Sequence, residues 1–247
     1  TSIPRLRLLS GTAGLVPKLQ RDFTARRRWM KALLSLEADV VLLDLGAGTH
    51  RDTLDLFTMA GHRIVVTSPE PTSIQNGYAF LKAGLFRRLE LALGSNPNFR
   101  DLFVRAQRTV GADRLESIHA LIDAAAVVEP RMAAEMRTLI QSIRPQLVIN
   151  QAGLEDEKRV YGALAVVAHR YLDLKPEHIA TLPDDPSVRV AVRRMRPVLV
   201  DAPDSPFGQR IRKLVDSVLA SQAMPSPELV LSASEDGDHG DLSLIHI

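Results

Sequence analysis

The sequence contains no cysteine, and only 4% of its 247 residues are aromatic. The absence of cysteine excludes disulfide bonds, thiolate zinc sites, cysteine-ligated iron–sulfur clusters and cysteine nucleophiles, and it is compatible with a reducing cytoplasm. The scarcity of aromatic residues means that the core must be built from Leu, Val, Ile and Ala. No apolar run reaches the roughly 18 residues that a membrane-spanning helix requires. We therefore expect a cytoplasmic protein.

Charge of neither sign dominates the sequence. The chain has 31 Lys and Arg residues against 29 Asp and Glu residues, which gives a formal net charge of +2. Because this balance is close, we do not expect a nucleic-acid partner. The hydrophobic fraction of 45% is ordinary for a globular protein, and the length is sufficient for one α/β domain with a sizeable core.

The segment VVLLDLGAG, residues 40–48, places an apolar run directly before one carboxylate, Asp44, and two glycines, Gly46 and Gly48. An unbroken Val/Leu run fits a strand buried on both faces of a parallel sheet. An Asp at the carboxyl end of such a strand lies at the edge where open α/β sheets bind ligands, and glycines let the backbone approach a ligand closely. This pattern is typical of a Walker B strand, whose Asp holds the Mg²⁺ of a bound nucleoside triphosphate. The alternative is a core strand whose Asp caps the next helix.

Short apolar runs alternate with helical patterns along most of the chain. Strands that alternate with helices form a parallel sheet covered on both faces. We expect strands at Arg5–Ser10, Val40–Asp44, His62–Thr67, Gln146–Asn150 and His178–Leu182. We expect helices at Leu15–Leu36, Arg51–Ala60, from a cap at Thr72 or Ser73 to about Leu93, and at Leu154–Tyr171, Ser187–Met195 and Ser205–Ser221, with additional helices in residues 96–143.

The two ends of the sequence differ from the rest. Residues 223–247 include the acidic run EDGD and predict a disordered tail. The last six residues, LSLIHI (242–247), resemble translated sequencing-adapter sequence, so we expect them to be non-native. The chain also opens on Thr1 instead of Met. These features predict a fragment of a longer open reading frame.

Four segments that follow predicted strands together resemble a known family. They are LDLGAG (43–48), PEPTSI (69–74), VINQ (148–151) and PDDPSV (183–188). In this order they resemble the deviant-Walker P-loop ATPases of the MinD/ParA class, and within that class the FlhG (YlxH) flagellar-number regulators. The resemblance covers most of residues 5–220, and residues 96–143 look like a helical insertion.

The resemblance implies a role for the first of these segments on the phosphate side of an ATP site. Asp44 would be the Walker B carboxylate and would hold Mg²⁺ directly or through a water. Gly46 and Gly48 would form the switch II turn that senses the γ-phosphate.

The other three segments would lie on the base side and at the dimer interface. Asn150 would hydrogen-bond the adenine, and Pro183 and Asp184 would wrap the base, largely through backbone groups. Thr72, in the loop 69–73, would lie near the nucleotide and the dimer interface. The alternatives stay open: Asn150 or Thr72 could cap a helix, and residues 183–186 could be only a turn.

The sequence departs from the family in one important respect. It contains no Gly-x-x-x-x-Gly-Lys-[Ser/Thr] motif anywhere, so the loop that cradles phosphates, its Lys and the switch I segment are missing. In the family these parts precede the strand that Arg5–Ser10 resembles. We therefore expect a truncation of about 90 residues that removed the first strand and the P-loop. A degenerate pseudo-ATPase is the other explanation.

The expected fold is a three-layer α/β/α domain of P-loop NTPase (SIMIBI, MinD-like) type over residues 1–222. The expected parent protein binds and hydrolyses ATP with Mg²⁺, forms a homodimer when ATP is bound, and controls flagellar number, flagellar placement or polar positioning. A flagellar or polarity protein would be its partner, and the fragment alone would be inactive. The alternatives are a ParA-like DNA partition ATPase, which requires converging arginine clusters, and a non-catalytic interaction module.

The resemblance also implies a peripheral membrane contact, since the family often ends in an amphipathic membrane-targeting helix. Residues 209–219 (QRIRKLVDSVL) carry basic residues on one side and aliphatic residues on the other. Either this helix contacts a membrane, or it is the last helix that packs on the sheet.

Overall fold

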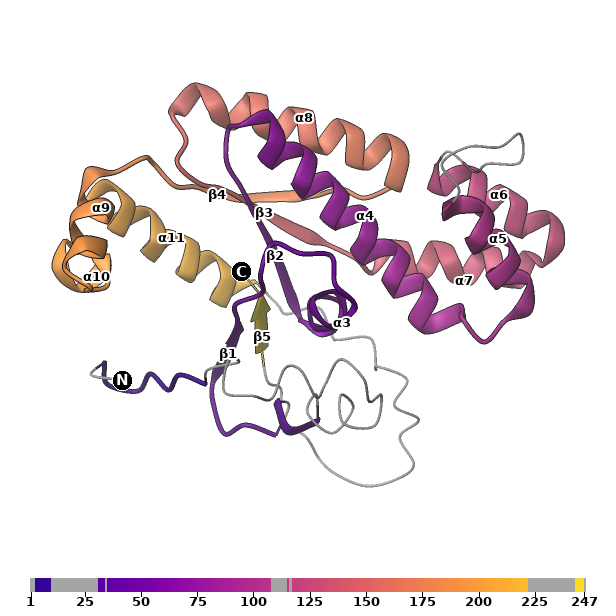
Figure 1. Cartoon of the computed structure of the whole chain (residues 1–247), viewed down its shortest axis with the longest axis horizontal. Helices are drawn as coiled ribbons and strands as arrows, with labels where there is room; N and C mark the ends of the chain where they lie inside the picture. Colours follow the sequence, from indigo (N-terminus) through magenta and orange to yellow (C-terminus); the bar gives the residue numbers. More distant parts are fainter. Residues whose placement is uncertain are drawn as a thin grey trace.

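The computed structural model describes residues 3–9, 31–33, 35–107, 115, 117–221 and 243–246. Its strands form one parallel sheet in the order β1-β5-β2-β3-β4 (Figure 1). Three adjacent strands, β2 to β4, are flanked by helices and give a mixed α/β architecture of Rossmann-like type. The strands are β1 (Val40–Leu43), β2 (His62–Thr67), β3 (Pro145–Ile149), β4 (Glu177–Thr181) and β5 (Ser243–His246).

The helices of the described residues connect and cover these strands. They are α3 (Arg51–Met59), α4 (Pro71–Leu93), α5 (Pro97–Gln107), α6 (Ile118–Val128), α7 (Pro130–Gln141), α8 (Leu154–Leu172), α9 (Pro186–Arg193), α10 (Val198–Asp201) and α11 (Pro206–Ala220). Proline stands at the start of α4, α7, α9 and α11, where its fixed φ suits the first turn and its missing N–H is not needed. None of the described helices is long and apolar enough to cross a bilayer.

Two layers of helices cover opposite faces of β2 and β3. On one face, Val65 and Leu147 lie in the same buried cluster as Leu81 of α4 and Leu164 of α8. On the other face, Ile64 packs with two residues of α11, and the cluster there consists of Ile64, Val148, Leu182, Leu214 and Val218. Side chains alternate between the two faces of a strand, so neighbouring residues of β2 serve different layers.

The packing of α11 decides between the two interpretations of residues 209–219. Leu214 and Val218 are buried against the sheet, and Ile211 packs beside them. The central apolar residues of this amphipathic helix are therefore covered by the sheet, as the second interpretation expects, whereas Val215 and Leu219 stay 46% and 58% exposed.

Helices α5, α6 and α7 follow α4 along the chain and precede β3. They form a helical unit within the predicted insertion 96–143 (Figure 1). Phe99, Leu121 and Met136 join the buried cluster that contains Leu85 and Leu89 of α4. The aromatic rings of Phe86, Phe99 and Phe103 also stack at centroid distances of 5.3 and 5.7 Å. The unit therefore packs on the C-terminal half of α4 and extends the helical layer.

Most predicted elements agree with the structure within one or two residues, but two predictions on β-structure are wrong. Residues 6–9 form no strand, because no described strand offers them a ladder partner. β1 is not buried on both faces, since only Val41 and Leu43 are covered, whereas Leu42 is 55% exposed. Val41 and Leu43 pack against Leu33 and the end of α3, and no described helix covers the opposite face of β1.

Several predictions fall outside the described residues. These are most of the helix 15–36 and most of the tail 223–247. The backbone of residues 243–246 is described as β5, which lies between β1 and β2 and is the only described strand that joins them. The position of β1 in the sheet therefore depends on its pairing with β5.

A buried ion pair joins α3 to α4. Arg87 donates Nε and Nη2 to the two carboxylate oxygens of Asp55, the second at 3.1 Å, and donates Nη1 to Glu90 at 2.7 Å. Burial lowers the pKa of Arg87, but the hydrogen bonds to Asp55 and Glu90 outweigh it and raise the pKa above its ordinary value. Arg51 also contacts Glu90 at 2.7 Å, but its side chain is 67% exposed.

We predict that Arg87→Met destabilises the protein by about 3 kcal/mol, because breaking a buried ion pair by removing one partner is strongly unfavourable. Arg51→Met, which removes an exposed ion pair to the same Glu90, is the matched control and is expected to change stability by less than about 1 kcal/mol. Urea denaturation of both variants measures the difference. Equal losses in the two variants would contradict the structural role assigned to the Arg87–Asp55 pair.

Candidate functional site

The carboxyl ends of β2, β3 and β4 are joined by backbone hydrogen bonds beyond the strands themselves. The N–H of Asn150 donates to the carbonyl of Thr67 at 2.7 Å, and the N–H of Leu182 donates to the carbonyl of Ile149 at 2.7 Å. The N–H of Ala152 then donates to the carbonyl of Leu182 at 3.1 Å. Three of the predicted site segments therefore lie side by side along one edge of the sheet, where open α/β sheets bind ligands.

The segment after β2 is held by side-chain hydroxyl groups. Ser73 Oγ lies 3.0 Å from Thr67 Oγ1 and accepts a hydrogen bond from the N–H of Ser68 at 2.9 Å. The hydroxyl of Ser68 donates to the carboxylate of Glu70. These contacts close the loop between β2 and α4 on itself.

Thr72 does not cap α4. The helix begins at Pro71 with Glu70 as its N-cap, which makes no side-chain cap hydrogen bond, so Thr72 lies inside the first turn. Its side chain is exposed at the edge of the sheet. The helix-cap alternative for Thr72 is therefore wrong, and so is the prediction that Ser73 caps α4.

A second contact to this loop was not predicted. Arg159 of α8 donates two hydrogen bonds to the carbonyl of Pro69, at 3.3 and 3.4 Å, and is itself paired with Asp156 at 2.6 Å. The two partners are 90 residues apart in the sequence. No local pattern could have indicated this contact, because only the packing of α8 beside α4 brings Arg159 to the loop.

Asn150 lies at the end of β3, half buried, with its backbone N–H bonded to Thr67. It does not cap α8, because the N-cap is Gly153, whose N–H donates to the carboxylate of Asp156 at 3.0 Å. Among the described residues, the side-chain amide of Asn150 has no hydrogen-bond partner. The amide therefore offers a donor and an acceptor at the edge where open α/β sheets bind ligands.

The segment after β4 is fixed by a residue that sequence analysis treated only as part of a turn. Asp185 caps α9 by accepting from the N–H of Ser187 at 2.8 Å, and it accepts from the N–H of Phe207, at the start of α11, at 3.0 Å. These two backbone donors, Phe207 first, hold the pKa of Asp185 below its ordinary value. Pro183 is half buried and Asp184 is exposed, with Asp184 lying 3.6 Å from the guanidinium of Arg189.

A hydrogen-bonded network supports the strand that leads into this segment. Thr181 Oγ1 donates to the carboxylate of Glu157 at 2.8 Å, and His178 Nε2 lies 2.9 Å from the same hydroxyl. The ring of Tyr161 lies 5.8 Å from the His178 ring, and its hydroxyl donates to the carbonyl of Pro176. The network ties β4 to α8 just before residues 182–184.

The structure does not bring Asp44 to the other predicted site residues. The register through β5 places Leu43 level with Arg63, whereas β2 continues to Thr67. At about 3.3 Å per residue, Asp44 therefore lies roughly 10 Å below the edge at Thr67. Asp44 is exposed, Gly46 has open space around its Cα, and Gly48 lies close to the His50 ring.

The fit of Mg²⁺ and ATP to these residues is uneven. Mg²⁺ is usually bound through one or two carboxylates together with substrate phosphates, and the described residues contain no cluster of three His, Asp or Glu residues that could hold a metal alone. The sequence has no phosphate-cradling motif, and Asp44 stands apart. The described residues therefore do not form a site for the phosphates and the metal.

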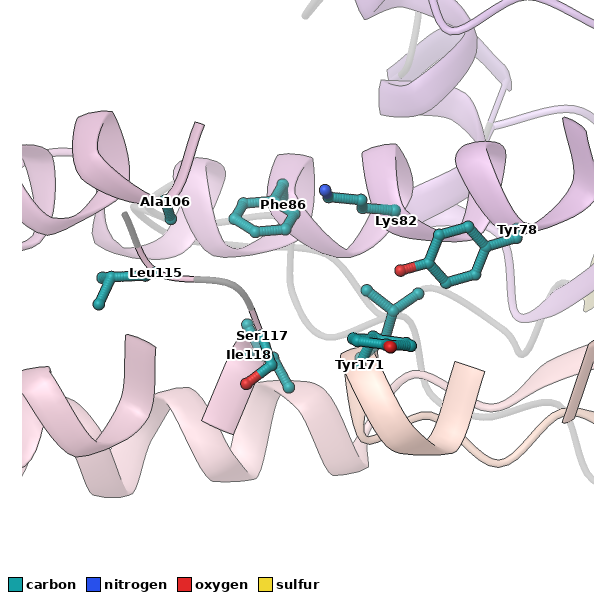
Figure 2. Close-up of a pocket in the computed structure, with 9 residues that line it drawn as sticks. Tyr78, Lys82, Phe86, Ala106, Leu115, Ser117, Ile118 and Tyr171 are labelled. Atoms are coloured by element: carbon teal, nitrogen blue, oxygen red, sulfur yellow. The ribbon is translucent and has the colours of Figure 1, made fainter. Parts of the chain in front are cut away.

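A small hollow elsewhere in the protein is separate from this edge (Figure 2). It lies between α4, the start of α6 and the end of α8, and both Tyr78 and Tyr171 line it. Burial, and secondarily Tyr171, raise the pKa of Tyr78. Lys82 lies 5.9 Å from the centroid of the Phe86 ring. This hollow is away from the strand ends and is not part of the candidate site.

No protein-family model matches the chain, and no curated protein matches it.

We predict that Asp185→Asn lowers stability at neutral pH, because an amide provides one oxygen acceptor in place of the two that Ser187 and Phe207 use. Since the folded-state pKa of Asp185 is lowered, its contribution is complete above its unfolded pKa of about 4 and is lost as the pH falls through the folded value. The difference in denaturation midpoint between wild type and Asp185→Asn should therefore shrink below pH 4. Asp184→Asn, at the exposed neighbour, is the control and should show little difference at either pH. A difference for Asp185→Asn that is independent of pH would contradict this role.

Proposed function

We propose that this chain carries the base-binding side of a nucleotide site of the MinD/ParA class, and that its parent protein is an ATP-dependent dimer switch of the FlhG type. The observation that supports the proposal most directly is the edge formed by β2, β3 and β4. There the loop 68–73, the amide of Asn150 and residues 182–184 lie side by side, tied together by backbone hydrogen bonds. Their order along the chain is the order that the resemblance requires.

The chemistry of this edge suits adenine. An Asn amide can donate to one ring position of adenine and accept from its amino group, a pairing that guanine does not offer in the same arrangement. Residues 183 and 184 follow a strand whose end is anchored to β3, so the backbone that would contact the base is held in place. Asp185 holds the other end of the same segment through Ser187 and Phe207.

The output of the proposed switch is spatial. ATP that binds only to the dimer would stabilise that state, and its hydrolysis would release it, so that the protein alternates between two assemblies. Placement or counting of flagella, or positioning of polar cargo, is the role we propose for the parent protein. Mg²⁺ and Asp44 would belong to the phosphate side, which the described residues do not form.

We predict that the chain binds an adenine nucleotide more tightly than a guanine nucleotide, and that Asn150→Ala weakens ATP binding by about tenfold or more. The reason is the loss of a paired donor and acceptor, which is worth about 1–3 kcal/mol. Titration with fluorescent mant-ATP and mant-GTP measures both effects. Asn76→Ala, at an exposed position on α4, is the control and should bind like wild type. Equal affinity for both nucleotides, unchanged in Asn150→Ala, would refute the base-binding assignment.

We further predict that the 247-residue chain shows no Mg²⁺-dependent ATP hydrolysis, because phosphoryl transfer depends on positioning and charge stabilisation by a phosphate-binding loop that the sequence lacks. A phosphate-release assay tests this. Asp44→Asn and Asp39→Asn form a matched pair, since the two exposed carboxylates flank opposite ends of β1. Turnover that Asp44→Asn abolishes and Asp39→Asn retains would contradict the prediction and show that the phosphate side is complete.

A further inference from the structure

Two arginines are buried near the amino end of β2. Arg63 is the second residue of this strand and is 2% exposed, and Arg88 of α4 is 7% exposed. Residues 63 and 65 of a strand point to the same face, and Val65 lies in the cluster that α4 covers. Burial, and then the charge of Arg88, lowers the pKa of Arg63 to about 10. We call Arg63 and Arg88 together the arginine pair.

The arginine pair has no anionic partner among the described residues. Nη1 of Arg63 and Nε of Arg88 are buried without a hydrogen-bond acceptor. Arg63 donates from Nη2 to the carbonyl of Thr58 at 3.0 Å, but neither guanidinium forms an ion pair with a described carboxylate. A buried cation that lacks a counter-charge is strongly unfavourable, and a second cation beside it adds repulsion.

The neighbouring arginine on α4 differs in exactly this respect. Arg87 donates to both carboxylate oxygens of Asp55 and also to Glu90, so its charge is balanced within the fold. Glu90 in turn also contacts Arg51. The described part of α3 and α4 thus supplies carboxylates for Arg87 and none for Arg88. The counter-charge of the arginine pair therefore has to come from outside the described residues.

We propose that the arginine pair binds a divalent oxoanion of the phosphate or sulfate type. Guanidinium groups present planar forks of N–H donors that match the oxygens of such anions. The pair offers Nη1 of Arg63 and the whole guanidinium of Arg88, which donates to no described residue. Two positive charges balance one divalent anion, whereas a single carboxylate would balance only one of them. Arg88 keeps the larger exposed fraction, so the anion enters from its side.

The arginine pair is separate from the candidate site. Arg63 is in register with Pro145 at the start of β3, whereas Thr67 is in register with Ile149 at its end. At about 3.3 Å per residue, the amino end of β2 lies about 13 Å from the edge at Thr67. The proposal does not depend on nucleotide binding, so it can fail or succeed without affecting the proposed function.

The test is thermal unfolding of the full chain in sodium phosphate, sulfate, acetate or chloride at equal ionic strength. Phosphate and sulfate should raise the melting temperature by on the order of 5 °C, and the rise should saturate, because a bound anion stabilises only the folded state. Acetate and chloride should give no saturating rise. Saturation separates binding from the general stabilisation by anions that are excluded from the protein surface.

Arg88→Met should abolish the saturating rise. In chloride alone this variant should melt at the wild-type temperature or higher, because it replaces an unpaired buried charge by an apolar side chain of similar length. The opposite is expected of Arg87→Met, whose charge is paired with Asp55. Arg63→Met is the second variant and should also abolish the rise, whatever stability it loses with the hydrogen bond to Thr58.

Two controls should keep the saturating response to phosphate. Arg51→Met removes an exposed positive charge from α3, and Asn150→Ala changes the opposite end of the sheet. Absence of a saturating response in the wild-type chain would overturn the proposal. A response that persists in both Arg88→Met and Arg63→Met, or that is lost in Arg51→Met or Asn150→Ala, would place the anion elsewhere and overturn it too. So would a response to acetate equal to that to phosphate.

Discussion

Parallel pairing of β2, β3 and β4 is the constraint on which the rest of this structure depends. Parallel strands cannot be joined by tight turns, so the chain must cross over the sheet between them. It does so with α4 to α7 between β2 and β3, and with α8 between β3 and β4. The same constraint gathers all carboxyl ends of the strands at one edge, and it requires that both faces be covered by helices. The candidate site and the two-sided core both follow from this arrangement.

Strands β2, β3 and β4 fix the positions of most candidate site residues, whereas the position of Asp44 depends on β5. Asn150 and Leu182 reach their neighbours through backbone hydrogen bonds that extend the ladder of β2, β3 and β4. Asp44, in contrast, is placed by β1, whose one partner among the described strands is β5. The height of Asp44 relative to Thr67 is therefore set by the register of β5.

The buried arginines of β2 and α4 differ in how many of their N–H groups have a hydrogen-bond acceptor. Arg87 makes three hydrogen bonds to carboxylate oxygens. Within the described part of the chain, Arg63 Nη1 and Arg88 Nε are buried without an acceptor. Burial, and then the nearby charge of Arg88, lowers the pKa of Arg63 to about 10. The α3–α4 ion pair is thus the charge interaction that holds this region, while α9 and α10 carry their arginines on the outside.

Sequence alone determined the elements and their order, because apolar runs and helical periodicity are local properties. β2, β3, α8 and α11 were all predicted within one or two residues. Sequence also placed Asn150 and residues 183–184 at strand ends, since the end of an apolar run is visible along the chain. The segments 69–74, 148–151 and 183–188 can be recognised for the same reason, because each contains or closely follows the end of such a run.

Only the tertiary structure decided which of these residues meet and which faces are covered. Arg159 reaches the Pro69 carbonyl across 90 residues, and Asp185 joins α9 to the start of α11, contacts that no local pattern contains. Leu42 lies in an apolar run yet is exposed, because burial of a strand depends on which helices pack over it. Conversely, the amphipathic pattern of α11 suits either a membrane or a sheet. In the structure this helix packs on the sheet, against Ile64 and Val148. Periodicity predicts an apolar face, and only the arrangement of neighbouring elements determines what covers it.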